Sequence, residues 1–382
     1  MTEEELLQAL RDGLSTEPST SRPAGIEIRQ DLVPAGGLPI WPPSYEGRLE
    51  IHKRYLDPGE EPRNVIELDS VGSAANRLED ALLELHRAGE YPLPVSSTIV
   101  EPSNGESREI TTLEAPHRLT DAWLRLADGD AEGTPFERTP HGEEISLADM
   151  RGLDVILETS AHDLLFGVWD SHRKGPHGQL RIPRSLTSSL IGLDPIRQAQ
   201  FAARRDPLNL GEASDLPKGS KKLSEQGLSS IPPQKQTPWE DGDDPRQKER
   251  DGQRGGVAIT SARYLGYLSF PALRRLGFAR YDAVETRVLL ASLALYALTL
   301  RDAAGWDLRA RCSLIAQDEL RFTLVLPKGE RREFLLSPDA AEKLFRGAVE
   351  RVGIDDRSVR LHAGATLNGL VEKSITASLT NA

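Results

Sequence analysis

The side chains best suited to chemistry lie between Ser171 and Arg184, a run that contains no acidic residue. Its cationic and titratable members are Arg173, Lys174, Arg181 and Arg184, with His172 and His177. The whole chain carries a formal net charge of -12, so an acid-free run is unexpected. Cations on a loop interrupted by Gly and Pro can hold a polyanion such as a phosphate backbone. An ordinary solvated loop is the alternative interpretation.

Two predicted helix starts carry similar side chains. Ser73, Asn76 and Arg77 fall in the first turn of a helix that follows the strand at residues 64–69, and His117 and Arg118 begin a second helix after Pro116. Free backbone N–H groups at a helix start favour an anion. The alternative for the first of these helices is ordinary capping, with Arg77 paired to an acid.

Aromatic residues accompany these cations, namely Trp123, Phe166 and Trp169. Guanidinium groups for phosphates and aromatic faces for bases are how proteins hold single-stranded nucleic acid. Taken one by one, Trp123 and Trp169 fit a hydrophobic core better than a stacking platform.

Several kinds of catalytic site are missing from the sequence. There is no GxGxxG, Walker or GxSxG motif, and KGPHG at 174–178 lacks the Ser or Thr that would hold Mg²⁺. The eight histidines lack metal-ligand spacing. We therefore predict no metal, no cofactor and no catalytic residue. An RNA-processing endonuclease with His117 or His177 as general base is the enzymatic alternative, and a protein scaffold without RNA is a third hypothesis.

Composition bounds the class of protein. The 382 residues are 38% hydrophobic and 28% charged, which suits a soluble chain of one large or two ordinary domains. The single cysteine, Cys312, excludes an internal disulfide and fits a cytoplasmic location. The acidic N-terminus does not have the pattern of a signal peptide. Residues 288–300 are too short an apolar run to span a bilayer and predict a core helix, so no membrane partner is expected.

Hydrophobic periodicity predicts interleaved strands and helices. Strands are expected at 25–32, 48–54, 64–69, 96–100, 110–113, 153–159, 164–169, 257–270, 308–316 and 320–326, the last two as a hairpin. Helices are expected at 2–13, 70–89, 116–126, 182–193, 283–304 and 338–352. Residues 128–149 suggest a solvated acidic loop, and 206–256 a mobile low-complexity insertion. Adjacent strands without strict βαβ alternation favour an α+β fold.

Four stretches carry a resemblance to a known family. They are DSVGSAANRLED at 69–80, LEAPHRLTDAWLR at 113–125, LLFGVWDSHRKGPHGQLRIPRSLTSSLIG at 164–192 and LRARCSLI at 308–315. In this order they resemble the RAMP-superfamily backbone subunit of type I-G (formerly I-U) CRISPR-Cas effector complexes, also called Cascade. The resemblance extends over most of the chain from about residue 24.

The resemblance implies a fold and a set of partners. The fold is an RRM-like (ferredoxin-type) antiparallel-sheet palm with large insertions, including a thumb. The implied boundaries are an N-terminal extension at 1–23, palm at 24–205 and 257–382, and an insertion or thumb at 206–256. Such subunits line up as a filament along guide RNA (crRNA) and have no cleavage activity. Their partners are further copies, the target DNA strand, the large and guide-processing subunits and a recruited helicase-nuclease.

The resemblance and the basic residues agree on where guide RNA would lie. The residues assigned to RNA are Ser73, Asn76, Arg77, His117, Arg118, Arg173, Lys174, His177, Arg181 and Arg184.

Overall fold

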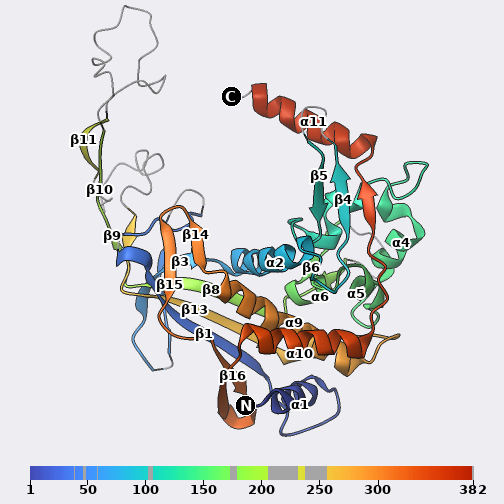
Figure 1. Cartoon of the computed structure of the whole chain (residues 1–382), viewed down its shortest axis with the longest axis horizontal. Coiled ribbons are helices and arrows are strands. Elements are labelled where there is room, and N and C mark those ends of the chain that lie inside the picture. The colour runs from blue at the N-terminus through green and yellow to red at the C-terminus, as the bar shows by residue number, and fades with distance from the viewer. Residues whose placement is uncertain are drawn as a thin grey trace, which may run out of the picture.

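The computed structural model describes residues 1–37, 39–45, 49–57, 59–101, 106–172, 179–204, 231–236 and 256–380. These residues form an open crescent, with the C-terminal helix α11 (Ala365–Thr380) at one tip (Figure 1). A large sheet with its helices makes one arm, and a smaller sheet surrounded by short helices makes the other.

The large sheet has nine strands among the described residues. Its central order is β14-β15-β1-β13-β8-β3-β2, and β16 pairs with both β1 and β17. Every pairing within it is antiparallel. The strands are β1 (Gly25–Pro34), β2 (Ile51–Arg54), β3 (Arg63–Asp69), β8 (Leu186–Leu193), β13 (Ala262–Ser269), β14 (Trp306–Arg309), β15 (Cys312–Ala316), β16 (Arg321–Val325) and β17 (Arg331–Leu335).

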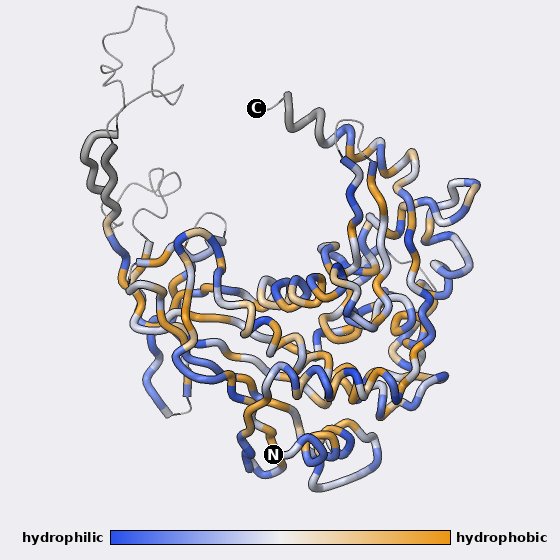
Figure 2. The backbone as a smooth tube through the Cα atoms, viewed as in Figure 1, coloured by the Kyte–Doolittle hydropathy of each residue, from blue (hydrophilic) through white to orange (hydrophobic). Residues whose placement is uncertain are grey.

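Alternation along β1 gives the sheet two faces. Ile26, Ile28 and Leu32 are buried in the main core, whereas Glu27 and Asp31 lie on the other side. A helical layer covers the apolar face, and Figure 2 shows hydrophobic residues concentrated along these strands and the helix above them. The period of two in the sequence therefore orients this strand.

Four long helices and the short helix α8 contribute to the main core. They are α1 (Glu3–Leu14), α2 (Val71–Arg87), α8 (Phe270–Arg274), α9 (Ala283–Ala303) and α10 (Pro338–Val352). α1 packs on α9, and Leu10 and Leu14 of α1 are fully buried in the main core, so the N-terminal extension is part of the same core. α9 is long and apolar enough to cross a membrane, but 78% of its most apolar stretch is buried in the protein, as predicted for a core helix.

The second arm is built around a three-stranded sheet. β4 (Ser97–Val100) pairs antiparallel with β5 (Arg108–Thr111) and parallel with β18 (Arg360–His362), which comes from the far end of the chain. The shorter elements here are η2 (Arg118–Thr120), α3 (Ala122–Arg125), η3 (Phe136–Arg138), α4 (Pro140–Leu147), α5 (Asp154–Ser160), α6 (Asp163–Phe166), β6 (Val168–Trp169) and β7 (Arg181–Ile182). β18 thus joins the C-terminal residues to the β4–β5 strand pair.

Three secondary-structure predictions between residues 153 and 193 are wrong. Residues 153–159 and 164–169 were expected as strands but form α5 and α6, with only β6 extended at the end. Residues 182–193 were expected as a helix but form β7 and β8. α5 and α6 are buried throughout, and β8 is buried on nearly every residue between β3 and β13. Elements buried on all sides lose the polar alternation that distinguishes helix from strand.

Three further expectations need correction. The hairpin of 308–316 with 320–326 does not form, because β15 and β16 instead pair with opposite ends of β1, and β15 makes its hairpin with β14. The acidic segment 128–149 is not wholly a loop, since it contains η3 and α4, the latter capped by Thr139. The helix predicted at 116–126 is broken into η2 and α3.

The predicted insertion at 206–256 lies largely outside the described residues. Within it the structure describes β11 (Ile231–Gln236), which pairs antiparallel with β10 (Gln200–Arg204). At the base of this pair, β9 (Ile196–Arg197) pairs with β12 (Val257–Ala258). The chain therefore leaves and re-enters the large sheet at neighbouring points.

Candidate nucleic-acid interface

A cavity of about 500 Å³ brings four predicted segments together, and we call it the arginine pocket. It is formed by the start of α2, the turn before η2, the end of α6 with β6, and β7 with the start of β8. The residues that line it are Val71, Pro116, His117, Arg118, Phe166, Gly167, Val168, Trp169, Arg181, Ile182, Pro183, Arg184 and Thr187. None of these described lining residues is acidic, although the chain as a whole is.

Arg181 and Arg184 give the pocket its free charge. Arg181 lies over the Trp169 ring, with 5.8 Å from its guanidinium carbon to the ring centroid. Within the described part of the chain, neither arginine forms an ion pair or side-chain hydrogen bond. Burial of part of the side chain, and then the nearby charge of Arg118, lower the pKa of Arg184. The charge of Glu79 opposes this lowering of the pKa but does not outweigh it. An arginine remains protonated in proteins, so an anion beside Arg184 would stabilise its guanidinium.

Trp169 forms the exposed edge of the pocket, with 60% of its surface accessible. The expectation that it belongs to the core is therefore wrong, whereas Phe166 is fully buried. Its indole Nε1 donates to Gln179 Oε1 at 3.2 Å, which leaves the ring face open to Arg181 and solvent. An exposed tryptophan beside unpaired arginines is the combination that stacks bases and holds phosphates.

A glycine permits the close pairing that creates this edge. Gly167 has φ +88°, and a Cβ there would come within 2.9 Å of Ile182 O and 3.0 Å of Arg184 N. Its position lets β6 and β7 pair, with Trp169 opposite Arg181 in register. Any larger residue would push the two strands apart.

Arg118 lines the same pocket but is committed to a buried ion pair. Its Nε and Nη2 donate to the two carboxylate oxygens of Glu79 at 2.5 and 2.7 Å, and its Nη1 donates to Gly167 O at 3.3 Å. Burial raises the pKa of Glu79, and the bonds from Arg118 oppose that rise. Burial also acts to lower the pKa of Arg118, but the hydrogen bonds and charge of Glu79 outweigh it. We take the pair as ionised because its geometry is bidentate.

Beneath Arg118 lies a fully buried polar group. Asp163 accepts hydrogen bonds from Leu119 N at 2.9 Å and Ser160 Oγ at 3.0 Å, and His162 Nε2 lies 3.3 Å from it. Burial raises the pKa of Asp163 to about 7 and lowers that of His162 to about 3. At neutral pH this histidine is therefore uncharged, so the short contact is not a full ion pair. These bonds fix η2 and hence the wall that carries His117.

The first helix start does not present its cation to solvent. Arg77 donates to Asp69 at 3.1 Å and to Leu308 O at 2.9 Å, as the alternative of ordinary capping predicts. Ser73 gives its N–H to the N-cap Ser70, while Asn76 is exposed. None of the three lines the arginine pocket, although α2 reaches it through Val71.

Three of the predicted RNA-binding residues, Arg173, Lys174 and His177, lie outside the described residues. His117 is exposed in the pocket, and its imidazole bonds to no described residue. Among the described side chains there is also no group of three His, Cys, Asp or Glu that could hold a metal ion. Sequence reasoning missed the exposure of Trp169 and the contributions of Val71 and Thr187.

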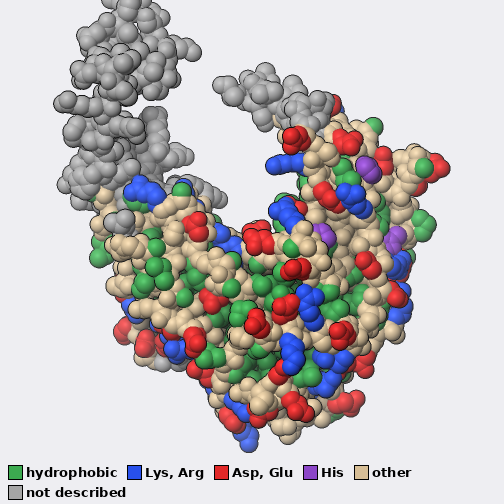
Figure 3. All heavy atoms as spheres, in the orientation of Figure 1, with side chains coloured by type: hydrophobic (Ala, Val, Ile, Leu, Met, Phe, Trp, Pro, Cys, Tyr) green, Lys and Arg blue, Asp and Glu red, His purple; other side chains and the backbone are tan. Residues whose placement is uncertain are grey.

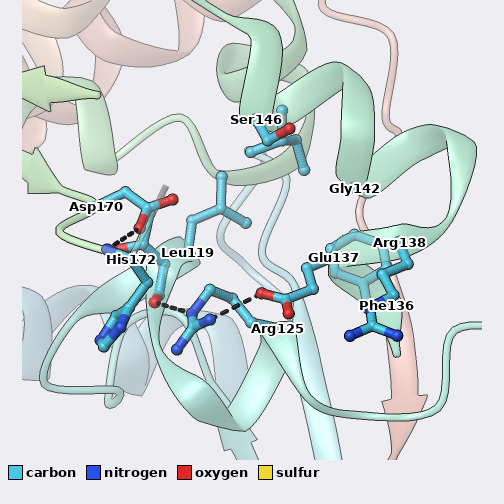
Figure 4. A pocket seen from close by; sticks show the side chains of 11 residues that line it. Leu119, Arg125, Phe136, Glu137, Arg138, Gly142, Ser146, Asp170 and His172 are labelled. Carbon is cyan, nitrogen blue, oxygen red and sulfur yellow. Dashed lines mark hydrogen bonds and ion pairs between the residues drawn. The ribbon is translucent and has the colours of Figure 1, made fainter. Parts of the chain in front are cut away.

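A second cavity of about 250 Å³, which we call the side cavity, adjoins the first. Figure 4 shows Asp170 and His172 on one side of it and Arg125 with Glu137 on another. Arg125 donates through Nε to Thr120 O at 2.9 Å and through Nη1 to Glu137 Oε2 at 2.7 Å. The two cavities lie on opposite sides of η2 and the end of β6, which separate them.

Fold and site together define a mixed α+β protein with a large antiparallel sheet and an acid-free, tryptophan-edged pocket. Residues 26–196, a little under half of the chain, match the family model described as CRISPR-associated protein GSU0053. This match supports a CRISPR-Cas subunit and confirms the resemblance found in the sequence. It includes three of the four stretches that carry the resemblance, and the whole lining of the arginine pocket. No curated protein matches the chain at a significant level.

Proposed function

We propose that this chain is a noncatalytic backbone subunit of a type I-G CRISPR interference complex, which binds guide RNA and oligomerises along it. The fold supports an RRM-like palm, because β16, β1, β13 and β8 lie in the order typical of ferredoxin-type sheets. α2 falls between β1 and β8 in the chain, and α9 falls between β13 and β16, as that fold requires. The strand pair β10–β11 is the described part of the proposed thumb.

The observation that carries the proposal is that no acid lines the described pocket and that neither Arg181 nor Arg184 forms an ion pair with a described residue. A phosphodiester would neutralise both guanidiniums without first breaking an ion pair. Contacts to phosphate carry no sequence information, which suits guides of many sequences. Trp169 would add sequence-tolerant stacking.

The proposed partners follow from the family. They are crRNA, the target DNA strand paired to it, further copies of this chain, the large and guide-processing subunits, and a recruited helicase-nuclease. An overall acidic chain is compatible with this arrangement if each copy contributes one local basic groove and keeps its outer surface negative.

We propose no catalysis for this chain. His117 is the enzymatic alternative on the described residues, but its imidazole contacts no described acid that would orient it as a general base. Incubation of the purified protein with repeat RNA in EDTA tests this point. Cleavage that is lost in His117→Ala would favour the endonuclease.

The central experiment measures binding of a single-stranded RNA to Arg181→Ala/Arg184→Ala over a range of salt concentrations. We expect an affinity loss of about tenfold or more, and a slope of log K against log salt reduced by about 1.4, for two phosphate contacts. Arg331→Ala/Arg360→Ala is the matched control: it removes the same charge from two exposed arginines that pair with Glu27 and Glu109. Equal losses in the two double variants would reject the pocket as the RNA site.

A further inference from the structure

A third cavity, of about 510 Å³, lies between α1 and α10, and we call it the α1–α10 groove. Both helices lie on the side of the crescent that faces away from its opening (Figure 1). The groove has an apolar part, formed by Leu7 of α1 and Leu344 of α10, and charged walls. It shares no lining residue with the arginine pocket or the side cavity. A groove between two helices has the shape that receives a third helix.

Every cation that lines this groove already has an acidic partner among the described residues. The pairs are Lys343 with Glu3 at 2.8 Å, Arg346 with Glu342 at 2.6 Å and Arg351 with Glu285 at 2.8 Å. Two lining acids are left over, Asp339 and Glu350, which are exposed and form no ion pair or side-chain hydrogen bond with a described residue. The groove therefore offers unpaired negative charge, which is the reverse of the arginine pocket.

The two unpaired acids lie at opposite ends of one face of α10. They are eleven residues apart, which is about three helical turns, or about 17 Å along the helix axis. Asp339 lies in the first turn, where the dipole of α10 itself favours an acid. Glu350 lies in the last turn, where the same dipole favours a cation instead. The helix to which Glu350 belongs thus gives no reason for an acid at that position.

A glycine lies on the same face between these two acids. Gly347 is in the interior of α10, where glycine destabilises a helix relative to alanine. A Cβ at this position would meet only the end of the Arg351 side chain, with Nη1 at 3.3 Å, so no packing within the described part of the chain requires a glycine. A glycine that faces an open groove allows close approach by the backbone of a partner.

We propose that the α1–α10 groove docks a helix of another protein, with two Lys or Arg residues eleven positions apart and apolar residues between them. The two cations pair with Asp339 and Glu350, and the apolar residues cover Leu7 and Leu344. The backbone of the partner helix comes closest over Gly347. Unpaired acids repel phosphates, so nucleic acid does not suit this groove. The interface is separate from the proposed RNA site and does not depend on it.

A second copy of this chain does not supply such a helix from its described residues. None of the described helices has Lys or Arg residues eleven positions apart. The C-terminal helix α11 has an exposed apolar residue, Leu370, but its only basic residue is Lys373. Charge complementarity therefore favours a different protein as the partner.

The probe is a capped helical peptide of about 20 residues, with two lysines eleven positions apart and two leucines between them on the same face. A second peptide has glutamates in place of the two lysines. Fluorescence anisotropy measures the binding of each labelled peptide to the full-length protein. We expect the wild type to bind the lysine peptide at least about tenfold more tightly than the glutamate peptide. Equal affinities would overturn the proposal.

Charge reversal tests whether the two acids set this preference. Asp339→Lys/Glu350→Lys should prefer the glutamate peptide, by about tenfold. The matched control is Glu132→Lys/Glu333→Lys, which makes the same change of charge at two exposed acids that line none of the three cavities. This control should keep the preference of the wild type. A preference that is not reversed in the first variant would reject the groove as the docking site.

Gly347→Leu tests the close approach without any change of charge. Leucine is the better helix former, so this variant should melt at or above the temperature of the wild type. It should bind the lysine peptide about tenfold more weakly, because the side chain enters the groove. Gly369→Leu is the control, since Gly369 is a glycine of α11 with open space around it, and it should bind as the wild type does. Unchanged binding by Gly347→Leu would overturn the proposal.

Two further measurements identify the occupant and separate this inference from the proposed function. Light scattering without peptide or RNA should give Gly347→Leu and the wild type the same mass. A wild type that is larger than Gly347→Leu would show that a second copy occupies the groove, and the proposal of another protein would be wrong. Gly347→Leu should bind single-stranded RNA as the wild type does, so loss of peptide binding leaves the RNA function intact.

Discussion

The arginine pocket and the polar face of the large sheet both carry arginines, but they differ in what those arginines contact. On the sheet, Arg263 bonds to Asp31 at 2.6 Å and lies 3.9 Å from Asp57, and Arg29 lies 3.8 Å from Asp57. In the arginine pocket no lining residue is acidic, and neither Arg181 nor Arg184 forms an ion pair with a described carboxylate; the charge of Glu79 reaches Arg184 only at longer range. The surface in Figure 3 likewise shows acidic and basic side chains interspersed, without one broad basic area on the face in view.

The difference shows that pairing, not the number of cations, separates a candidate anion site from an ordinary surface. An arginine already within about 4 Å of a carboxylate has to lose that partner before it gains from a phosphate. Arg118 extends the comparison inside the pocket itself, because it lines the cavity yet is bound to Glu79. Its role is to hold the wall in place.

The largest expected effect is on stability, in Arg118→Ala. Loss of the guanidinium leaves Glu79 as a buried charge without its partner, which costs about 3–5 kcal/mol of unfolding free energy. Urea denaturation measures the loss. Arg87→Ala is the control, since its pair with Glu114 is exposed and contributes about 1 kcal/mol or less. Similar losses in the two variants would show that the Arg118–Glu79 pair does not hold the pocket wall.

The buried residues Asp163 and His162 should make the stability of the fold depend on pH in opposite directions. The raised pKa of Asp163, about 7, stabilises the fold below its unfolded pKa of about 3.9, and that stability is lost as pH rises to 7. The lowered pKa of His162, about 3, stabilises the fold above about 6.5, and that stability is lost as pH falls. Between about pH 4 and 6.5 the two effects cancel.

Single variants remove the cancellation. In His162→Gln the free energy of unfolding should fall as pH rises from 4 to 7, by up to about 1.4 kcal/mol per pH unit. In Asp163→Asn it should instead fall as pH drops below 6.5. Urea denaturation at a series of pH values measures both slopes. Slopes of the same sign in the two variants would show that these groups do not titrate as the buried geometry requires.

Removal of the exposed Trp169 ring tests whether a base stacks at the edge of the arginine pocket. Trp169→Ala should weaken single-stranded RNA binding by about 1–3 kcal/mol, because one base loses its stacking surface and Arg181 loses its aromatic partner. Tyr55→Ala is the control, since Tyr55 is 72% exposed but lines neither cavity. Fluorescence anisotropy with labelled oligouridine measures both. An unchanged affinity in Trp169→Ala would exclude stacking at this edge.

The smallest expected effect is a gain of RNA affinity on the polar face of the large sheet. Asp31→Asn/Asp57→Asn frees Arg263 and Arg29 on the sheet, so this face should gain a weak, salt-sensitive affinity for RNA. We expect a rise of about twofold to fivefold in an Arg181→Ala/Arg184→Ala background, with a salt slope larger by up to about 1.4. No gain would mean that pairing is not what keeps the sheet face from binding RNA.

The sequence predicts well those elements that have one solvent-exposed and one buried side, or a long apolar helical run. β1, β3 and α2 follow from alternation and helical spacing, and α9 follows from its long apolar run. Prediction failed for α5, α6 and β8, which are buried on nearly every residue and so carry no polar period. The pairing of β18 with β4 joins residues more than 250 positions apart, which no local pattern records.

For the site, the sequence alone determined that residues 171–184 form an acid-free run in an acidic chain, and that the chain resembles a CRISPR-associated family. Only the tertiary structure decided which cations of the described set stay free. Glu79 pairs with Arg118 across 39 positions and Asp69 pairs with Arg77, whereas no described acid forms an ion pair or hydrogen bond with Arg181 or Arg184. The physical reason is that ion pairing depends on distances of about 4 Å or less in space. Those distances are set by how the sheet and helices pack.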